Sequence, residues 1–170
     1  MLYGVLSDTH NHLAPTRRAI DALLDAGARR IVHCGDMGPD ALDLLRASCL
    51  AAQVPLFWAW GNCDFADSDA RFAPLPPGLT RADWQVDCST PDVSCLALHG
   101  HNPFPLRTAA ASGRYAYVFH GHTHHPSAER VGDTWLLNPG SPSRPRSAPP
   151  SVLLLDTDTA RFHWLPLDTP

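Results

Sequence analysis

Short runs of histidine, aspartate and asparagine are the residues of this chain that could bind metal ions. The run at residues 118–125 contains His122 and His124, two positions apart. In an extended segment such side chains point the same way, so one strand end can present two imidazoles to one small volume. Neutral imidazole is the commonest protein ligand for borderline divalent metals. On its own, this run could equally be a polar loop with one or two hydrogen-bonded histidines.

Other runs earlier in the chain have the same character. Each also has a structural explanation, because Asp8 could cap a helix and the pairs Gly-Asp and Gly-Asn are common in turns. Taken together, the candidate donors are Asp8, His10, Asp36, Asn62, His99, His122 and His124. They exceed the four ligands of one tetrahedral ion and suit two metals about 3.5–4 Å apart that share a bridging carboxylate.

An apolar segment precedes each run and predicts a buried strand. These segments are residues 2–6, 30–33, 54–59, 93–98 and 115–119. Ligands of open α/β folds bind at the carboxyl ends of strands, and neighbouring strands lie about 4.8 Å apart. Donors from adjacent strand ends can therefore converge on one site.

The rest of the chain predicts the elements that hold these strands. Apolar periodicity predicts one helix that starts after Pro15 and stops at Gly27, and two more at about residues 40–49 and 106–112. Alternation predicts three hairpins, which pair residues 84–88 with 93–98, 127–130 with 134–137, and 151–156 with 161–166. We expect one loop at residues 65–77 and another that follows residues 138–141 and ends at residue 150.

Length and charge limit the classes of function. The 170 residues, 44% of them hydrophobic, indicate one globular domain over residues 1–170. No apolar run approaches the ~20 residues of a membrane span. The net charge of −4 predicts no patch for nucleic acid or for an anionic membrane. The chain has no lysine, which excludes a Schiff-base lysine and a P-loop lysine.

Cysteine usage predicts a reducing compartment. The five cysteines are Cys34, Cys49, Cys63, Cys88 and Cys95. Their number is odd and no Cys-x-x-Cys pair occurs, which argues against a disulfide scaffold and against a thiolate zinc site. The N-terminal residues also have no basic segment of the kind that opens a signal peptide. We therefore expect a cytoplasmic protein.

The ordered set of runs resembles the five sequence blocks of the calcineurin-like metallophosphoesterases. The matching segments are residues 7–10, 35–36, 61–64, 99–101 and 121–124, and their order and spacing most resemble the small phosphodiesterases of bacteria and archaea. Residues 138–141, Asn-Pro-Gly-Ser, also look like a block of that small branch. The resemblance implies an α/β fold, a two-sheet mixed β-sandwich flanked by helices in four α-β-β-α layers.

The resemblance also implies a ligand set and a reaction. One metal would bind Asp8, His10, His124 and the bridging Asp36, and the other Asp36, Asn62, His99 and His122. Imidazole, carboxylate and amide donors suit manganese, iron, cobalt, nickel or zinc better than magnesium or calcium, and we expect manganese. Two such ions, two carboxylates and a bridging hydroxide leave the site at about +1, which favours an anionic phosphate ester. The metal-bridging hydroxide would attack phosphorus in line.

One position departs from the pattern of the wider superfamily, in which a histidine thought to protonate the leaving group follows the asparagine. Here Cys63 occupies that position, as it often does in the small branch. Its thiol could donate a proton or only line the pocket, and His101 is the nearest other candidate acid.

Three functions follow as hypotheses. The first is a phosphodiesterase that acts on a small phosphate-ester substrate. The second is a phosphomonoesterase for a nucleotide or another small phosphate. The third is a non-catalytic scaffold with the same fold, as in the retromer subunit of the superfamily, although that protein has lost several ligand positions that are filled here. A homodimer would also be compatible with the sequence.

Overall fold

The computed structural model describes residues 1–64 and 80–168 of the chain. Within these residues the strands form two sheets, with the orders β11-β10-β1-β2-β3-β4 and β5-β6-β7-β9-β8. The first sheet contains β1 (Leu2–Leu6), β2 (Arg30–His33), β3 (Leu56–Ala59), β4 (Thr80–Asp83), β10 (Ser151–Asp156) and β11 (Arg161–Pro166). The second contains β5 (Gln85–Asp87), β6 (Cys95–Leu98), β7 (Tyr117–Phe119), β8 (Ser127–Val131) and β9 (Thr134–Asn138).

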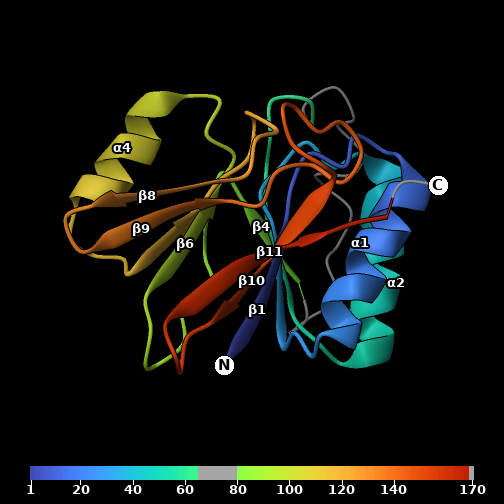
Figure 1. The fold of residues 1–170 in the computed structure, drawn as a ribbon, viewed down its shortest axis with the longest axis horizontal. Helices are drawn as coiled ribbons and strands as arrows, with labels where there is room; N and C mark the ends of the chain where they lie inside the picture. The colour runs from blue at the N-terminus through green and yellow to red at the C-terminus, as the bar shows by residue number, and fades with distance from the viewer. Residues whose placement is uncertain (65–79, 169–170) are drawn as a thin grey trace.

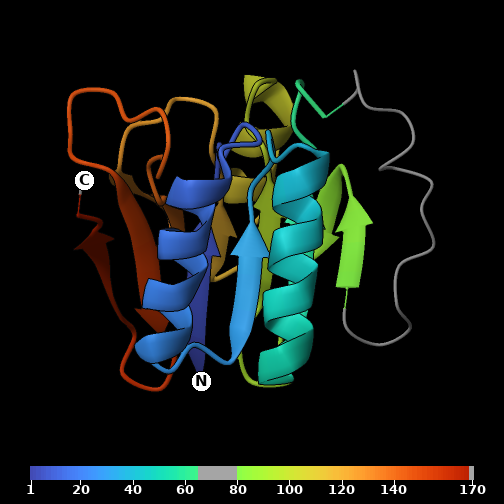
Figure 2. The same cartoon turned by 90° about the vertical axis from the view of Figure 1, so that its right-hand side faces the viewer.

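Helices cover the outer faces of both sheets. Helices α1 (Leu13–Asp25) and α2 (Pro39–Ala52) lie side by side over the first sheet, and α4 (Pro103–Ala111) covers the second (Figures 1 and 2). The order of layers is therefore helix, sheet, sheet, helix, which confirms the predicted sandwich. In the described part of the chain, no helix combines the length and the apolar character needed to cross a membrane.

The alternation of side chains along the strands creates three apolar layers. In β3, Leu56 and Trp58 pack toward α1 and α2, whereas Phe57 and Ala59 pack between the sheets. In β7, Phe119 faces the space between the sheets and Val118 faces α4. Both faces of the central strands are buried, which explains why these strands read as continuous apolar runs.

Strand direction brings the polar runs to one edge of the sandwich. Strands β1, β2 and β3 are parallel to one another, and β6 is parallel to β7. Their carboxyl ends lie at the same edge, at the top of Figure 2 for β1 and β2. The loop after β1 is fixed to α2, because Asn11 Oδ1 accepts hydrogen bonds from the backbone N–H groups of Asp40 at 2.8 Å and Ala41 at 3.0 Å.

Most predicted elements are present, and the differences have physical causes. The strands at residues 2–6 and 30–33 and the final hairpin are confirmed at their predicted bounds. The first helix begins at Leu13, before Pro15. The helix can include this proline because backbone N–H groups of the first turn have no acceptor within the helix, so the missing N–H of Pro15 breaks no hydrogen bond. Strand β4 was not predicted, and the loop expected at residues 65–77 lies outside the described residues.

Candidate metal centre

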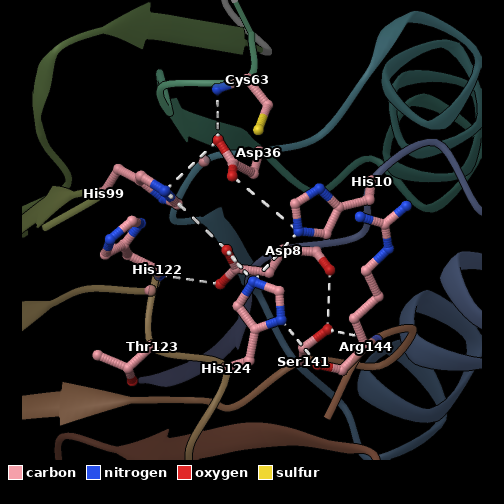
Figure 3. A network of polar contacts seen from close by, with 12 residues as sticks. Asp8, His10, Asp36, Cys63, His99, His122, Thr123, His124, Ser141 and Arg144 are labelled. Atoms are coloured by element: carbon pink, nitrogen blue, oxygen red, sulfur yellow. Dashed lines mark hydrogen bonds and ion pairs between the residues drawn. The ribbon is translucent and has the colours of Figure 1, made fainter. Parts of the chain in front are cut away.

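The structure brings the predicted donors to one end of the sandwich (Figure 3). Asp8, His10 and His124 form one group whose candidate ligand atoms all lie within 4.8 Å of one another. Asp8, Asp36 and His99 form a second group that meets the same criterion. Two other predicted donors, Asn62 and His122, line a cavity of about 480 Å³ at this end of the molecule. The strand ends therefore converge as the sequence pattern predicts.

Distances between donor atoms match those around shared ions. His10 Nε2 and His124 Nε2 are 3.2 Å apart, and His124 Nε2 lies 3.3 Å from Asp8 Oδ1. His99 Nε2 lies 3.4 Å from Asp36 Oδ1, and His10 Nε2 lies 4.0 Å from Asp36 Oδ2. Ligands about 2.1 Å from one tetrahedral ion are separated by about 3.4 Å. The two oxygens of Asp36 face different histidines, which suits a bridging carboxylate.

Backbone carbonyls fix which ring nitrogen of two histidines faces the site. His99 Nδ1 lies 2.8 Å from the carbonyl oxygen of Cys34, and His124 Nδ1 lies 2.7 Å from that of Arg144. A carbonyl oxygen only accepts, so each Nδ1 carries a hydrogen and donates it. The Nε2 atoms are thereby left toward the carboxylates, in the orientation that a metal-ligating histidine needs.

Two buried atoms of the cluster have no hydrogen-bond partner among the described residues. They are Asp8 Oδ1 and His99 Nε2, and both residues are almost fully buried. A buried polar atom without a partner costs about 1–3 kcal/mol. Both atoms face other donors of the cluster at 3.3–4.0 Å, as in Figure 3. A divalent cation between them would satisfy both, so these residues fit the metal that the donor set implies.

Charges within the cluster keep the carboxylates ionised. Burial alone would raise the pKa of Asp36, but His99 and the backbone N–H of Cys63 outweigh it and lower that pKa. The pKa of Asp8 is lowered in the same way, against burial, by His124 and His99. Asp8 raises the pKa of His124, and Asp36 raises that of His99 although burial opposes it. Both shifts favour the protonated rings, so a bound cation would compete with protons for these two histidines.

Glycines let two of the strand ends approach the carboxylates. A Cβ on Gly61 would collide with Asp36 Oδ1 and with the Asp36 backbone nitrogen. A Cβ on Gly121 would collide with Ser7 Oγ and with Asp8 Oδ2. The turns after β3 and β7 can therefore come close to the two aspartates only because these positions are glycine.

A buried aspartate that was given no role from the sequence supports the Asp36 turn. Asp64 accepts hydrogen bonds from the backbone N–H groups of Gly61, Asp36, Met37 and Gly38, at 2.7, 2.9, 2.8 and 3.3 Å. It thereby joins the turn after β2 to the turn after β3. The sequence run at residues 61–64 includes Asp64, but its spacing alone did not show whether this carboxylate would bind a metal or support the turn.

The Asn-Pro-Gly-Ser segment supports the other side of the site. Asn138 Nδ2 donates to the carbonyl oxygen of Gly121 at 2.9 Å and to Thr123 Oγ1 at 3.0 Å. Ser141 Oγ donates to the carbonyl oxygen of Asp8 at 2.8 Å. The segment thus holds the loops after β1 and β7 together. The following loop adds Arg144 and Arg146 to the lining of the 480 Å³ cavity.

The two candidate acids line different cavities. Cys63 lines the same cavity as His10 and Asp36. Burial and the Asp36 carboxylate raise the pKa of its thiol to about 12, so it stays protonated at neutral pH. His101 instead lines a neighbouring cavity of about 220 Å³, and its ring centroid lies 6.3 Å from that of His122.

Two other histidines contact the loops around the site through hydrogen bonds. His33 Nδ1 accepts from the backbone N–H of Gly35 at 3.1 Å, and its Nε2 lies 3.1 Å from Thr9 Oγ1. Nδ1 of His120 lies 3.3 Å from Asn138 Nδ2. Both rings are largely buried, and burial lowers the pKa of His33 to about 3 and that of His120 to about 4.

Comparison with known proteins gives consistent matches over most of the chain. The calcineurin-like phosphoesterase superfamily domain matches residues 1–160. Phosphodiesterase MJ0936 of Methanocaldococcus jannaschii is 28% identical over 99% of this chain and 100% of its own length. Phosphodiesterase YfcE of Escherichia coli is 32% identical over 89% of this chain and 85% of its own length. The solved structure of a novel archaeal phosphodiesterase superimposes with a TM-score of 0.78 at 26% identity and covers 98% of this chain and 100% of its own.

Proposed function

Since the chain belongs to the calcineurin-like phosphoesterase superfamily, we propose that it is a metal-dependent phosphodiesterase with a dinuclear centre. The observation that carries the proposal is the pair of buried atoms Asp8 Oδ1 and His99 Nε2, which lie where several strand ends converge and have no hydrogen-bond partner among the described residues. Relatives named phosphodiesterases cover nearly the whole chain, which supports the same activity for it.

We assign the ligands in two overlapping sets. Asp36 would bridge, with one ion held by Asp8, His10 and His124 and the other by Asn62, His99 and His122. The distances of 3.2 and 3.3 Å among His10, His124 and Asp8 support the first set. The 3.4 Å separation of His99 and Asp36 supports the second. Manganese is our first candidate, with iron, cobalt, nickel and zinc as alternatives.

The residues of the chain would bind and orient the ester. When bound, two divalent cations supply Lewis acidity and increase the acidity of a water nucleophile. Arg144 and Arg146 add positive charge to the lining of the same cavity, where they can hold the non-bridging oxygens of a phosphate. The side chains of Ser141 and Asp64 hydrogen-bond to backbone groups of Asp8 and Asp36 and so hold the loops that carry these two ligands in place.

A substrate and metal panel tests the proposal. We expect the protein, purified with stoichiometric transition metal, to hydrolyse bis(p-nitrophenyl) phosphate faster than p-nitrophenyl phosphate. Asp36→Ala and Asp36→Asn should both lose metal and activity. Asp133→Ala is the matched control, because Asp133 is exposed and pairs only with the exposed Arg130 among the described residues. A protein without bound metal would support the scaffold hypothesis, and metal retained in both Asp36 variants would refute the bridging assignment.

A phosphomonoesterase is the second candidate, and the two cavity arginines favour it. Arg144 and Arg146 could neutralise the extra negative charge of a monoester. In the same panel, a monoester rate above the diester rate that falls in Arg144→Ala would support this alternative.

The leaving group gives a separate prediction. Cys63, with a thiol pKa of about 12, is a weak proton donor at neutral pH. We therefore expect aryl esters, whose leaving groups need no proton, to be cleaved much faster than alkyl esters. Steady-state rates on matched methyl aryl and dialkyl diesters provide the measurement. Equal rates would show that a general acid is present.

We also propose a single domain over residues 1–170, a cytoplasmic location and a homodimer. The five cysteines are free in the structure, which supports a reducing compartment. Sedimentation of the purified protein measures the oligomeric state directly.

A further inference from the structure

A second cavity, distinct from the one that holds most donors, lies behind His99. Its volume is about 220 Å³. Its lining is rich in rings and includes Trp60, Trp84, His101 and Pro105, with Gln85 and Asn102 as amide groups. Trp84 is 38% exposed, so the cavity opens to solvent and is not part of the packed core.

The rings of this cavity form its walls at defined angles. Trp60 and Trp84 meet edge to face, with centroids 5.7 Å apart and planes at 84°. The ring of His101 lies 6.2 Å from that of Trp84. Aromatic walls with few polar groups are typical of sites for flat, largely apolar ligands.

The cavity adjoins the candidate metal centre through histidine rings. His99 lines this second cavity, and its Nε2 lies 3.4 Å from Asp36 Oδ1. The ring centroids of His101 and His122 are 6.3 Å apart, and His122 lines the 480 Å³ cavity that holds most donors. The two cavities therefore lie on either side of these histidine rings, close enough for one nucleotide to place its phosphate among the donors and its base against the tryptophans.

We propose that this cavity binds the nucleobase of a nucleotide substrate, so that the phosphodiesterase acts on nucleotide diesters. The inference rests on the proposed function for the position of the phosphate. The aromatic rings provide stacking faces for the base, and the amide of Gln85 and the Nδ2 group of Asn102 can pair with its polar edge, since Asn102 Oδ1 accepts from the backbone N–H of Phe104. Stacking of a base on an aromatic side chain changes affinity by about 5-fold to 150-fold, enough to select nucleotides over other diesters.

Calorimetry of product-like ligands tests the inference without turnover. Adenosine 5′-monophosphate and ribose 5-phosphate carry the same sugar phosphate and differ by the base. We expect the manganese-loaded protein to bind the nucleotide about tenfold more tightly or better. The preference should disappear in Trp84→Ala and persist in Trp84→Phe. Phe104→Ala is the matched control, because Phe104 is 77% exposed and lines a different cavity.

The outcomes separate this inference from the proposed function. Equal affinity for the two ligands, or a preference that survives in Trp84→Ala, would overturn the nucleobase site even if diesters are hydrolysed. A preference that depends on Trp84 would support the nucleobase site even if no diester is hydrolysed. In that case the proposed phosphodiesterase activity would be wrong and the site would stand.

Discussion

At the scale of single residues, five of the seven proposed ligands are held in an uncommon backbone conformation. The φ angles are 56° for Asp8, 47° for His10, 56° for Asp36, 67° for His122 and 58° for His124. Aspartate and histidine tolerate this left-handed region better than most residues, but it still carries strain of roughly 1–3 kcal/mol at each position. The residue types were predictable from the sequence. The conformation was not, because it depends on contacts between different strand ends.

Substitution of His122 can measure this strain. His122 is exposed and has a φ of 67°, so loss of its side chain removes little packing. We expect His122→Gly to be more stable than His122→Ala by about 1 kcal/mol in urea unfolding with chelator present, because glycine adopts this conformation freely. His125 is also exposed but lies outside the left-handed region, so His125→Ala should be more stable than His125→Gly. The same order at both positions would argue against strain at His122.

His33 predicts how stability depends on pH. Its Nδ1 accepts the Gly35 N–H, so the ring is neutral and donates from Nε2 to Thr9, which in turn donates to the carbonyl oxygen of Met37. Burial lowers the pKa of His33 from 6.5 to about 3 in the folded protein. The unfolded chain therefore binds a proton below about pH 6.5 that the folded chain rejects. Stability is complete above that pH and is lost as the pH falls toward 3.

The expected size of this effect is about 1.4 kcal/mol per pH unit. Between pH 7.5 and 5.0, metal-free wild type should lose about 2 kcal/mol more free energy of unfolding than His33→Gln, which cannot titrate. Urea unfolding at both pH values measures the difference. Identical losses in the two proteins would mean that His33 is already protonated in the folded state at pH 5.0.

At the scale of elements, the sequence predicted the strands best where both faces are buried. Residues 2–6 and 30–33 are continuous apolar segments, and the structure confirms both as strands. Strand β4, Thr80–Asp83, was missed because its sequence Thr-Arg-Ala-Asp has no apolar pattern and the strand lies at a sheet edge. Helix α2 runs past the predicted end because Gln53 ends it in a left-handed conformation without a glycine.

Close approach of strand ends depends on glycine, which gives a prediction at this scale. In Gly61→Ala, the new Cβ would push Asp36 away from its position between His99 and His10. We expect bound metal to fall below two equivalents and kcat/KM to fall about 100-fold, since small misplacements of reacting groups cost that much. Metal analysis and diester kinetics provide the measurements.

Gly113→Ala is the control for general destabilisation. Gly113 has a φ of +66° and no neighbour within 4 Å of an added Cβ, so alanine there adds backbone strain away from the site. This variant should lose stability but keep both metals and full activity. If Gly61→Ala kept its metal as well, close packing against Asp36 would not control the site.

At the scale of the whole molecule, the candidate centre joins the two sheets. Asp8, His10, Asp36 and Asn62 follow strands of the first sheet, whereas His99, His122 and His124 follow strands of the second. Strand ends and their donors could be read from the sequence. The meeting of two sheets at one edge could not, because periodicity contains no information on how sheets pack. Only the resemblance to a known family supplied that expectation, and the contact between His99 and Asp36 agrees with it.

Metal binding should therefore stabilise both sheets together. Ions at 100 times their dissociation constant stabilise the folded state by about 2.7 kcal/mol, which for a chain of this size corresponds to a Tm difference of about 5–10 °C on addition of chelator. Hydrogen exchange should become faster at the carboxyl ends of β1 and β2 and also at those of β6 and β7, because the ions contact both sets. Asp36→Asn, which removes the bridging charge while preserving shape, should show a much smaller response to chelator. Faster exchange in only one sheet would place the metal on one side of the sandwich and contradict a centre shared between the sheets.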